Sequence, residues 1–210
     1  LDTHSFPVGS LPLLRVGIVP VFSLCGNTDP SCPYLKYEVS MTPTTLANIL
    51  DGTITTWAHS GIHYYDEDGN EVIDDAARPP SSMLIVIVRT TDPENSMWEQ
   101  AFKESLAKLS PGFCYSEMGH TRESIEAIKT YVYGAAGSLA VVPITSPINK
   151  KMAHNVHLEL DGYSHASGIE SAIEPNPSTF AAESWPLTVT IAFTFPVEFG
   201  PKECSPRNDG

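Results

Sequence analysis

The chain has 210 residues, 41% of them hydrophobic, which is enough to bury a core in one domain or in two small lobes. Its formal net charge of −13 argues against a nucleic-acid partner and against binding to anionic membranes, because both need a basic face. The longest apolar runs, Met83 to Val88 and Leu139 to Ile144, are far too short to span a bilayer, so no membrane insertion is expected.

The first residues carry no export signal. Leu1 to His4 has neither the basic segment nor the apolar segment of a signal peptide, and the chain does not begin with Met. We therefore expect it to be a processed or excised piece of a longer protein.

The first predicted element is a buried strand. Leu11 to Phe22 is a long apolar, β-branched run, which is typical of a strand that is covered on both faces. A helix is then predicted to begin at Pro43, with the Thr42 hydroxyl as its N-cap and proline at the first helical position. Gly52 fits the C′ position that ends this helix.

Four cysteines are present, and two lie close together in the sequence. Cys25 and Cys32 flank the turn-rich stretch Gly-Asn-Thr-Asp-Pro-Ser, which predicts a disulfide there, and Cys114 could then pair with Cys204. Four unrelated buried thiols are the alternative. A zinc site is disfavoured because the sequence has no C-x-x-C motif. The disulfides would indicate an oxidising compartment.

The middle of the chain alternates between strands and helices. Tyr64 to Val72 is interpreted as a hairpin tip, with Asp68-Gly69 as the left-handed turn residues. Gly134 to Gly137 is interpreted as a helix stop before a strand. In chain order we expect a strand over 83–88, a helix that Asp92-Pro93-Glu94 caps with Asp92 as the N-cap and that runs to Leu109, a helix over 121–133 and a strand over 139–144. This alternation predicts an α/β sheet with helices packed on it.

The last part of the chain is expected to contain mostly loop and one strand. Asn149 to Ser184 is polar and rich in Gly, Pro and Ser, which is typical of loop. Trp185 to Phe195 has the alternating character of a final strand. The tail from Gly200 to Gly210 is expected to fray unless Cys204 holds it.

One segment resembles the signature of a known family. Leu46-Ala-Asn-Ile-Leu-Asp-Gly-Thr-Ile-Thr-Thr-Trp57 follows the pattern L-A-x-I-x-x-G-x-I-T-x-W, which is similar to the signature of periplasmic phosphate-binding proteins of ABC transporters, the PstS type. Four other segments resemble the same family in the same order, namely Leu11 to Leu24, Ser82 to Arg89, Thr130 to Val142 and Trp185-Pro-Leu-Thr. Together they cover most of Leu11 to Phe195, although only the first signature is specific by itself.

The resemblance implies an α/β periplasmic-binding-protein-like lobe, a mixed sheet with helices on both faces. It implies a second-lobe domain over residues 23–184, crossing strands and a remnant of the first lobe at 1–22 and 185–199, and a tail at 200–210. Family members are much longer, so the chain resembles a second lobe with remnants of the first. A ligand cleft needs both walls, and this truncation therefore argues against ligand binding.

The family's anion-binding loop corresponds to Val88 to Ser96. In the family the strand continues into H-R-S-D-G-S-G-T-T and a helix, where the arginine clamps the anion and Ser-Gly-Thr donates hydrogen bonds. In this chain Arg89 matches the clamp and Thr90 replaces its serine neighbour. Asn95 and Ser96 are the remaining candidates for ligand binding.

The rest of this loop departs from the family. Pro93 removes a backbone donor, and Asp92 and Glu94 place carboxylates where the oxygens of the anion would lie. The expectation is that phosphate binding is lost and that Arg89 forms a structural ion pair beside a helix cap.

No metal site or cofactor is expected. Asp66 to Asn70 has side-chain oxygens at alternate positions, as in a calcium loop, but it lacks the distal bidentate Glu and is interpreted as a solvated hairpin tip. His59 with His63, and His154 with His157, have the spacing of metal pairs on helices. Neither pair has a third ligand nearby in sequence, so both are interpreted as surface histidines.

No G-x-S-x-G, H-E-x-x-H, Walker or G-x-G-x-x-G motif occurs, so the chain is not expected to be an enzyme. The sequence predicts a non-catalytic PstS-like domain with a degenerate phosphate site. It would act as a binding, structural or assembly module of a secreted or cell-surface protein, through protein partners or self-assembly. The alternative is a functional receptor for phosphate or another oxyanion in periplasmic ABC-type uptake, which would need Arg89, Thr90, Asn95 and Ser96 to converge with groups from a first lobe.

Overall fold

The structure is a computed structural model of the chain. It describes residues 8–26, 31–91, 93–114, 119–143, 154–159 and 187–196.

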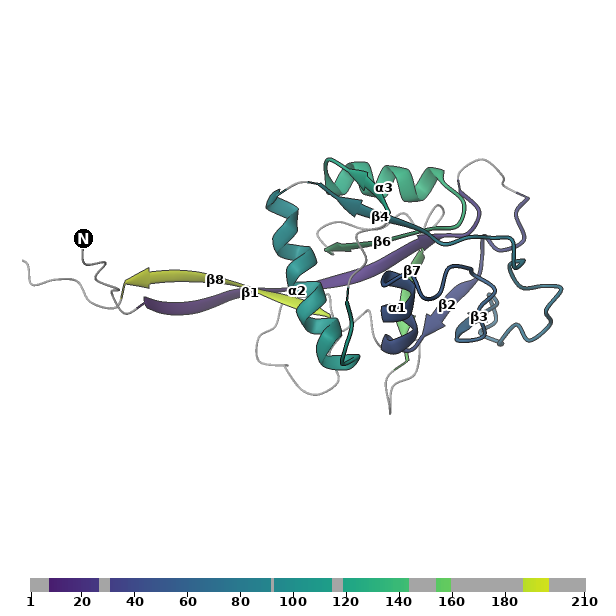
Figure 1. Ribbon diagram of the computed structural model, residues 1–210, viewed down its shortest axis with the longest axis horizontal. Coiled ribbons are helices and arrows are strands. Elements are labelled where there is room, and N and C mark those ends of the chain that lie inside the picture. The colour runs from purple at the N-terminus through teal and green to yellow at the C-terminus, as the bar shows by residue number, and fades with distance from the viewer. Residues whose placement is uncertain are drawn as a thin grey trace, which may run out of the picture.

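Strands within these residues form one mixed, eight-stranded sheet (Figure 1). The strands are β1 (Val8–Ser23), β2 (Glu38–Met41), β3 (Ile62–Tyr65), β4 (Val86–Thr90), β5 (His120–Arg122), β6 (Ser138–Pro143), β7 (His154–Leu158) and β8 (Thr188–Pro196). Their order is β3-β2-β7-β1-β6-β4-β5, and β8 pairs with β1 off this path. The pairs β2–β7, β4–β6 and β4–β5 are parallel, whereas β1 runs antiparallel to each of its neighbours. The predicted mixed α/β sheet is confirmed.

Three helices pack on the sheet within the described residues, namely α1 (Pro43–Leu50), α2 (Pro93–Leu109) and α3 (Ile125–Gly134). Helix α3 contacts β1, β4 and β6, while α2 contacts α1, β6 and β8. The capping signals for α1 are confirmed, because the Thr42 side chain accepts a hydrogen bond from the Thr45 backbone N–H at 3.1 Å. Pro43 takes the first helical position, as the sequence predicts.

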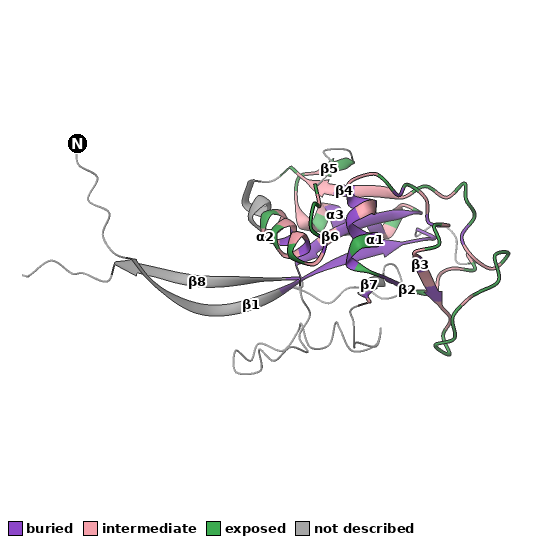
Figure 2. Ribbon diagram, turned by 60° about the horizontal axis from the view of Figure 1, so that its bottom comes forward, coloured by how far each residue is buried: buried purple, intermediate pink, exposed green. Residues whose placement is uncertain are grey.

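The family-like signature ends in the core of the protein. Trp57 is completely buried, and its indole Nε1–H donates to the Gly137 carbonyl oxygen at 2.8 Å. The buried Tyr64 hydroxyl donates in turn to the Trp57 carbonyl oxygen. These bonds join the turn after α1 to the start of β6 and to β3. Figure 2 shows the buried residues gathered in this body of the sheet.

Strand β1 belongs to two parts of the sheet. From Val8 to Gly17 it pairs with β8, and from Ile18 to Ser23 it pairs with β6. Figure 1 shows the β1–β8 part extending beyond the helices as a two-stranded ribbon. We call this part, residues 8–17 and 188–196, the ribbon. The predicted first and last strands therefore lie side by side, whereas the division of the chain into lobe and remnant stays a prediction.

The Cys25–Cys32 disulfide is confirmed and closes the loop after β1. Cys114 is exposed and forms no disulfide with another described cysteine, and its predicted partner Cys204 lies outside the described residues. That second pairing therefore stays a prediction.

Two predicted elements begin later than the sequence indicated. The strand expected from Met83 begins at Val86, because the preceding residues bond to the turn at Thr55 to Trp57 instead. The helix expected from Thr121 begins at Ile125 with Ser124 as its N-cap, because residues 120–122 pair with β4 as strand β5.

Besides β5, three strands were not predicted. β7 lies within the stretch that was expected to be mostly loop, and β2 and β3 were not foreseen. Each has only four or five residues, and two of them, β2 and β7, lie next to each other in the sheet. Segments this short show no clear periodicity in the sequence, and their strand conformation depends on pairing with neighbouring strands.

Candidate functional site

The predicted anion clamp lies at the carboxyl end of β4. Arg89 and Thr90 are the last two residues of this strand, which has parallel neighbours β6 and β5 on its two sides. In α/β sheets, ligands commonly bind at the carboxyl ends of parallel strands. The position of Arg89 is therefore compatible with a binding site.

A side chain of the protein itself is bound to this clamp. One oxygen of the Glu99 carboxylate, Oε2, lies 3.3 Å from Arg89 Nη2. The other, Oε1, accepts a hydrogen bond from the Thr90 backbone N–H at 3.4 Å. The two ion-paired side chains are only 15% and 16% exposed, so the pair is largely shielded from water. The ion pair expected for Arg89 is thus present, with Glu99 as the partner.

Helix geometry explains how Glu99 reaches the strand. Side chains on a helix lean toward its N-terminus, and α2 begins at Pro93, six residues before Glu99. Glu99 also shares a helix face with Phe102 and Leu106, which are completely buried. The carboxylate is therefore held on the inner face of α2, directed back toward the end of β4. Glu99 is not among the predicted site residues, although an acidic residue three and seven positions before two core residues indicates that its carboxylate needs a partner.

The other predicted ligand residues are not brought into this arrangement by any described contact. Asn95 and Ser96 lie in the first turn of α2, where the structure describes the backbone alone, and Asp92 lies outside the described residues. The convergence of Asn95 and Ser96 with Arg89 and Thr90 therefore stays a prediction.

The segment after β4 is fixed by the neighbouring strand β5. The Thr91 backbone N–H donates to the Arg122 carbonyl oxygen at 2.8 Å. The Arg122 guanidinium lies over the Tyr131 ring of α3, 4.1 Å from its centroid, and the His120 ring stacks on the same tyrosine. Arg122 is thus engaged with α3.

The acidic turn is a hairpin tip, as predicted, but of the predicted left-handed pair Asp68-Gly69 only Gly69 has a positive φ, +78°. Tyr65 and Glu71 form a bridge, and Asp66 Oδ1 accepts hydrogen bonds from the backbone N–H groups of Asp68 and Asn70 at 3.0 and 2.8 Å. The hydrogen bond from the Asn70 backbone is the largest cause that lowers the pKa of Asp66. The Asp66 carboxylate is thus used to close the turn.

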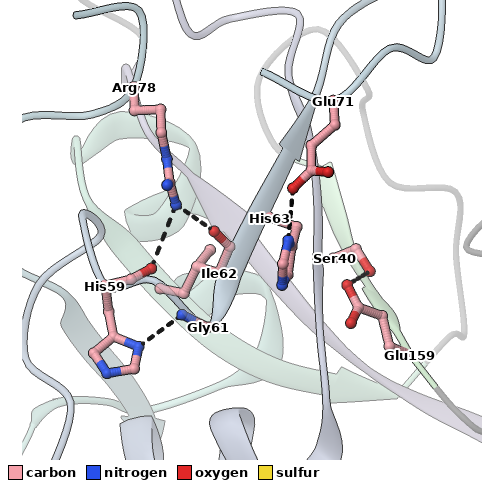
Figure 3. Close-up of polar contacts among 8 residues, drawn as sticks. All are labelled: Ser40, His59, Gly61, Ile62, His63, Glu71, Arg78 and Glu159. Carbon is pink, nitrogen blue, oxygen red and sulfur yellow. Dashed lines mark hydrogen bonds and ion pairs between the residues drawn. The ribbon is translucent and has the colours of Figure 1, made fainter. Parts of the chain in front are cut away.

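The histidines have separate partners (Figure 3). His63 Nδ1 lies 2.7 Å from Glu71 Oε1, whereas His59 Nδ1 accepts from the Gly61 backbone N–H at 3.1 Å. His154 and His157 lie on strand β7 and not on a helix. In the described part of the chain, no group of three His, Cys, Asp or Glu side chains could hold a metal ion.

A polar cluster covers the sheet near His63. Ser40 is completely buried and its hydroxyl donates to Glu159 Oε1 at 2.6 Å (Figure 3). Burial raises the pKa of Tyr65, and the negative charges of Glu159 and Glu71 raise it further. Each of these two carboxylates has its own hydrogen-bonding partner, Ser40 for Glu159 and His63 for Glu71.

Comparison with known proteins identifies the fold. No protein-family model and no curated sequence matches the chain. Among solved structures, an ABC-type phosphate transport receptor from Vibrio cholerae matches 95% of this chain with 14% identity and a TM-score of 0.55. PstS from Borrelia burgdorferi matches 91% with 13% identity and a TM-score of 0.54.

The match covers only part of those proteins. The chain corresponds to 65% of the Vibrio cholerae protein and 62% of the Borrelia burgdorferi protein. A protein from Clostridium perfringens, described as a phosphate ABC transporter substrate-binding protein and solved with bound phosphate, is covered to 58%, with a TM-score of 0.52 and 15% identity. The fold is therefore that of periplasmic-type solute-binding proteins. Within that class, the chain resembles the PstS-type phosphate-binding proteins and has roughly three fifths of their length.

Proposed function

We propose that the chain is a non-catalytic, PstS-like domain with a degenerate phosphate site, which acts as an assembly module of a secreted or cell-surface protein. The observation that carries this proposal is the ribbon. Nine residues of β1 between Val8 and Gly17 pair with β8 beyond the point where β1 leaves β6, and in the described sheet β8 pairs with no strand other than β1. A two-stranded ribbon is marginally stable in water by itself and needs a packing partner.

The composition of the ribbon favours a protein partner. Arg15 is its one charged residue, in a chain with a net charge of −13. Edge strands that must stay unpaired usually carry charges, so the ribbon lacks the usual protection against pairing. The backbone register places Leu11 beside Phe193 and Ser10 beside Thr194, which puts apolar residues on one face and polar residues on the other. The proposed partner is a second copy of this chain, joined through the apolar face.

The disulfide is compatible with a secreted or cell-surface protein. The Cys25–Cys32 disulfide is typical of secreted proteins. Among the described residues, the structure contains no helix with the length and apolar character needed to cross a membrane.

The test is the mass of the full chain in solution, measured by light scattering over a range of concentrations. We expect an oligomer larger than the 22.8 kDa monomer. Phe193→Glu should shift the equilibrium to monomer, whereas the matched Thr194→Glu, one position along on the opposite face, should not. A chain that stays monomeric at every concentration, or two variants with the same effect, would reject the assembly role.

A second candidate function is an oxyanion receptor. It is favoured by one observation, namely that the Arg89 guanidinium and the Thr90 N–H converge on a single carboxylate. Calorimetric titration of phosphate and then sulfate into the full chain separates the two functions. Micromolar binding, about −8 kcal/mol, would support the receptor, and the absence of heat would support a degenerate site.

A further inference from the structure

We propose that the Glu99 carboxylate is a built-in ligand of Arg89 and the Thr90 N–H, and that it occupies the place of a free oxyanion. The proposal rests on the degenerate phosphate site of the proposed function, and it gives the reason why that site does not bind phosphate. It also implies that removing the charge of Glu99 creates a site for a tetrahedral oxyanion.

The chemistry of the contacts supports this assignment. A carboxylate and a phosphate both accept hydrogen bonds from guanidinium and backbone N–H donors. Glu99 uses one oxygen for each donor, Oε2 for Arg89 and Oε1 for Thr90. Both donors lie at the carboxyl end of β4, the edge at which ligands commonly bind in α/β sheets. Glu99 thus bridges the two groups that a bound oxyanion would bridge.

Charge and burial explain why a free anion would be excluded. The ion pair is largely shielded, so the Arg89 charge is neutralised in a region of low solvent access. An entering phosphate would have to displace Glu99 or bring a second negative charge beside it. A side chain on the same fold also competes at a high effective concentration, in the millimolar range for flexibly tethered groups.

The distances indicate that the charge of Glu99 contributes more to this contact than hydrogen-bond geometry does. Contacts of 3.3 and 3.4 Å are longer than the range of about 2.7 to 3.2 Å that is usual for N–H···O hydrogen bonds. Glu99 is ten residues from Arg89 and on a different element, so the contact is not a local feature of the helix. Removal of the Glu99 carboxylate should therefore have the largest effect on anion binding at this site.

The experiment is calorimetric titration of inorganic phosphate, with sulfate as a second probe, into the full chain and four variants. Glu99→Gln removes the charge and keeps the length of the side chain. Glu104→Gln is the matched control, because Glu104 lies on the same helix, bonds to the exposed Gln100, and gives the same change in net charge. Arg89→Gln combined with Glu99→Gln removes the clamp. Glu99→Met serves as a second neutral variant with good helix propensity, in case the glutamine variant does not fold.

We expect no measurable phosphate binding by the unmodified chain and by Glu104→Gln. Glu99→Gln and Glu99→Met should bind at least about tenfold more tightly than the unmodified chain, and the double variant should lose this gain. The Thr90 backbone amide resonance should shift on phosphate addition in Glu99→Gln and not in the double variant.

Three results would overturn the inference. If the folded Glu99 variants bind phosphate no better than Glu104→Gln, the inference fails while the degenerate site of the proposed function stands. If the gain persists without Arg89, the anion binds elsewhere. If the unmodified chain binds phosphate with micromolar affinity, both the inference and the degenerate site are wrong.

Discussion

We expect the replacement of Gly137 to destabilise the protein strongly, because this glycine supports the turn that carries Trp57. Its φ is +73°, and a Cβ placed there would lie 2.5 Å from the Leu84 carbonyl oxygen. The Gly137 carbonyl oxygen also accepts hydrogen bonds from Trp57 Nε1 and from the Val86 backbone N–H, at 2.8 and 2.9 Å. Gly137→Ala therefore combines an unfavourable backbone conformation with a backbone collision at a point that holds two hydrogen bonds.

The size of the effect follows from these contacts. The left-handed backbone costs a residue with a Cβ about 1 kcal/mol or slightly more. The Leu84 or Gly137 carbonyl group must then move, which weakens two buried hydrogen bonds worth about 1 kcal/mol each. Gly137→Ala should lower the free energy of unfolding by about 3 kcal/mol, and at an m-value near 2 to 3 kcal/mol/M the urea midpoint should fall by about 1 M.

Gly69→Ala is the matched control. Gly69 has nearly the same φ, +78°, but no atom lies within 4 Å of the position of an added Cβ. Its replacement should cost only the conformational part, about 1 kcal/mol. Urea unfolding followed by tryptophan fluorescence measures both variants. Equal losses of stability in the two variants would refute the collision and show that the backbone angle alone matters.

Two further predictions concern the disulfide and the buried tyrosine. Cys25→Ser combined with Cys32→Ser should lower the free energy of unfolding by about 2 kcal/mol, because the disulfide closes a short loop. If a reducing agent leaves the melting temperature of the unmodified chain unchanged, the expected stabilisation by the disulfide is contradicted. Burial raises the pKa of Tyr64, and a folded pKa above the unfolded value of 10.0 means that stability is complete below pH 10 and is lost as the pH rises above it. Tyr64→Phe should remove much of this alkaline loss in urea titrations between pH 9 and pH 11, and an unchanged slope would exclude Tyr64 as its source.

The sequence predicted the elements that carry strong local signals. Helix α1 begins and ends as its caps indicate, because Thr42, Pro43 and Gly52 each fix the backbone locally. Helix α2 begins at Pro93 as predicted, and the Cys25–Cys32 disulfide forms across its turn-rich loop. The PstS-like fold was also recognised from the Leu46–Trp57 signature and confirmed by solved structures.

The missed features depend on residues that are distant in the sequence. Strand β5 has three residues and is held by parallel pairing with β4, so Thr121 was placed in the following helix. Strand β7 was hidden in polar sequence and is fixed by β1 and β2. Glu99 lies beyond the family's anion-binding motif, which corresponds to Val88 to Ser96. Its role depends on the helix bringing it back to Arg89, which only the three-dimensional arrangement shows.

The continuity of β1 has a mechanical consequence. The same strand forms one side of the ribbon and then passes between β6 and β7 in the core. A pull along the ribbon would therefore load the hydrogen bonds between β1 and β6 in shear, all of them at once and not one after another. Whatever binds the ribbon is thus tied directly to the most buried strand of the body, where every residue from Ile18 to Cys25 is buried. A tether of this kind transmits tension into the fold without a hinge of its own.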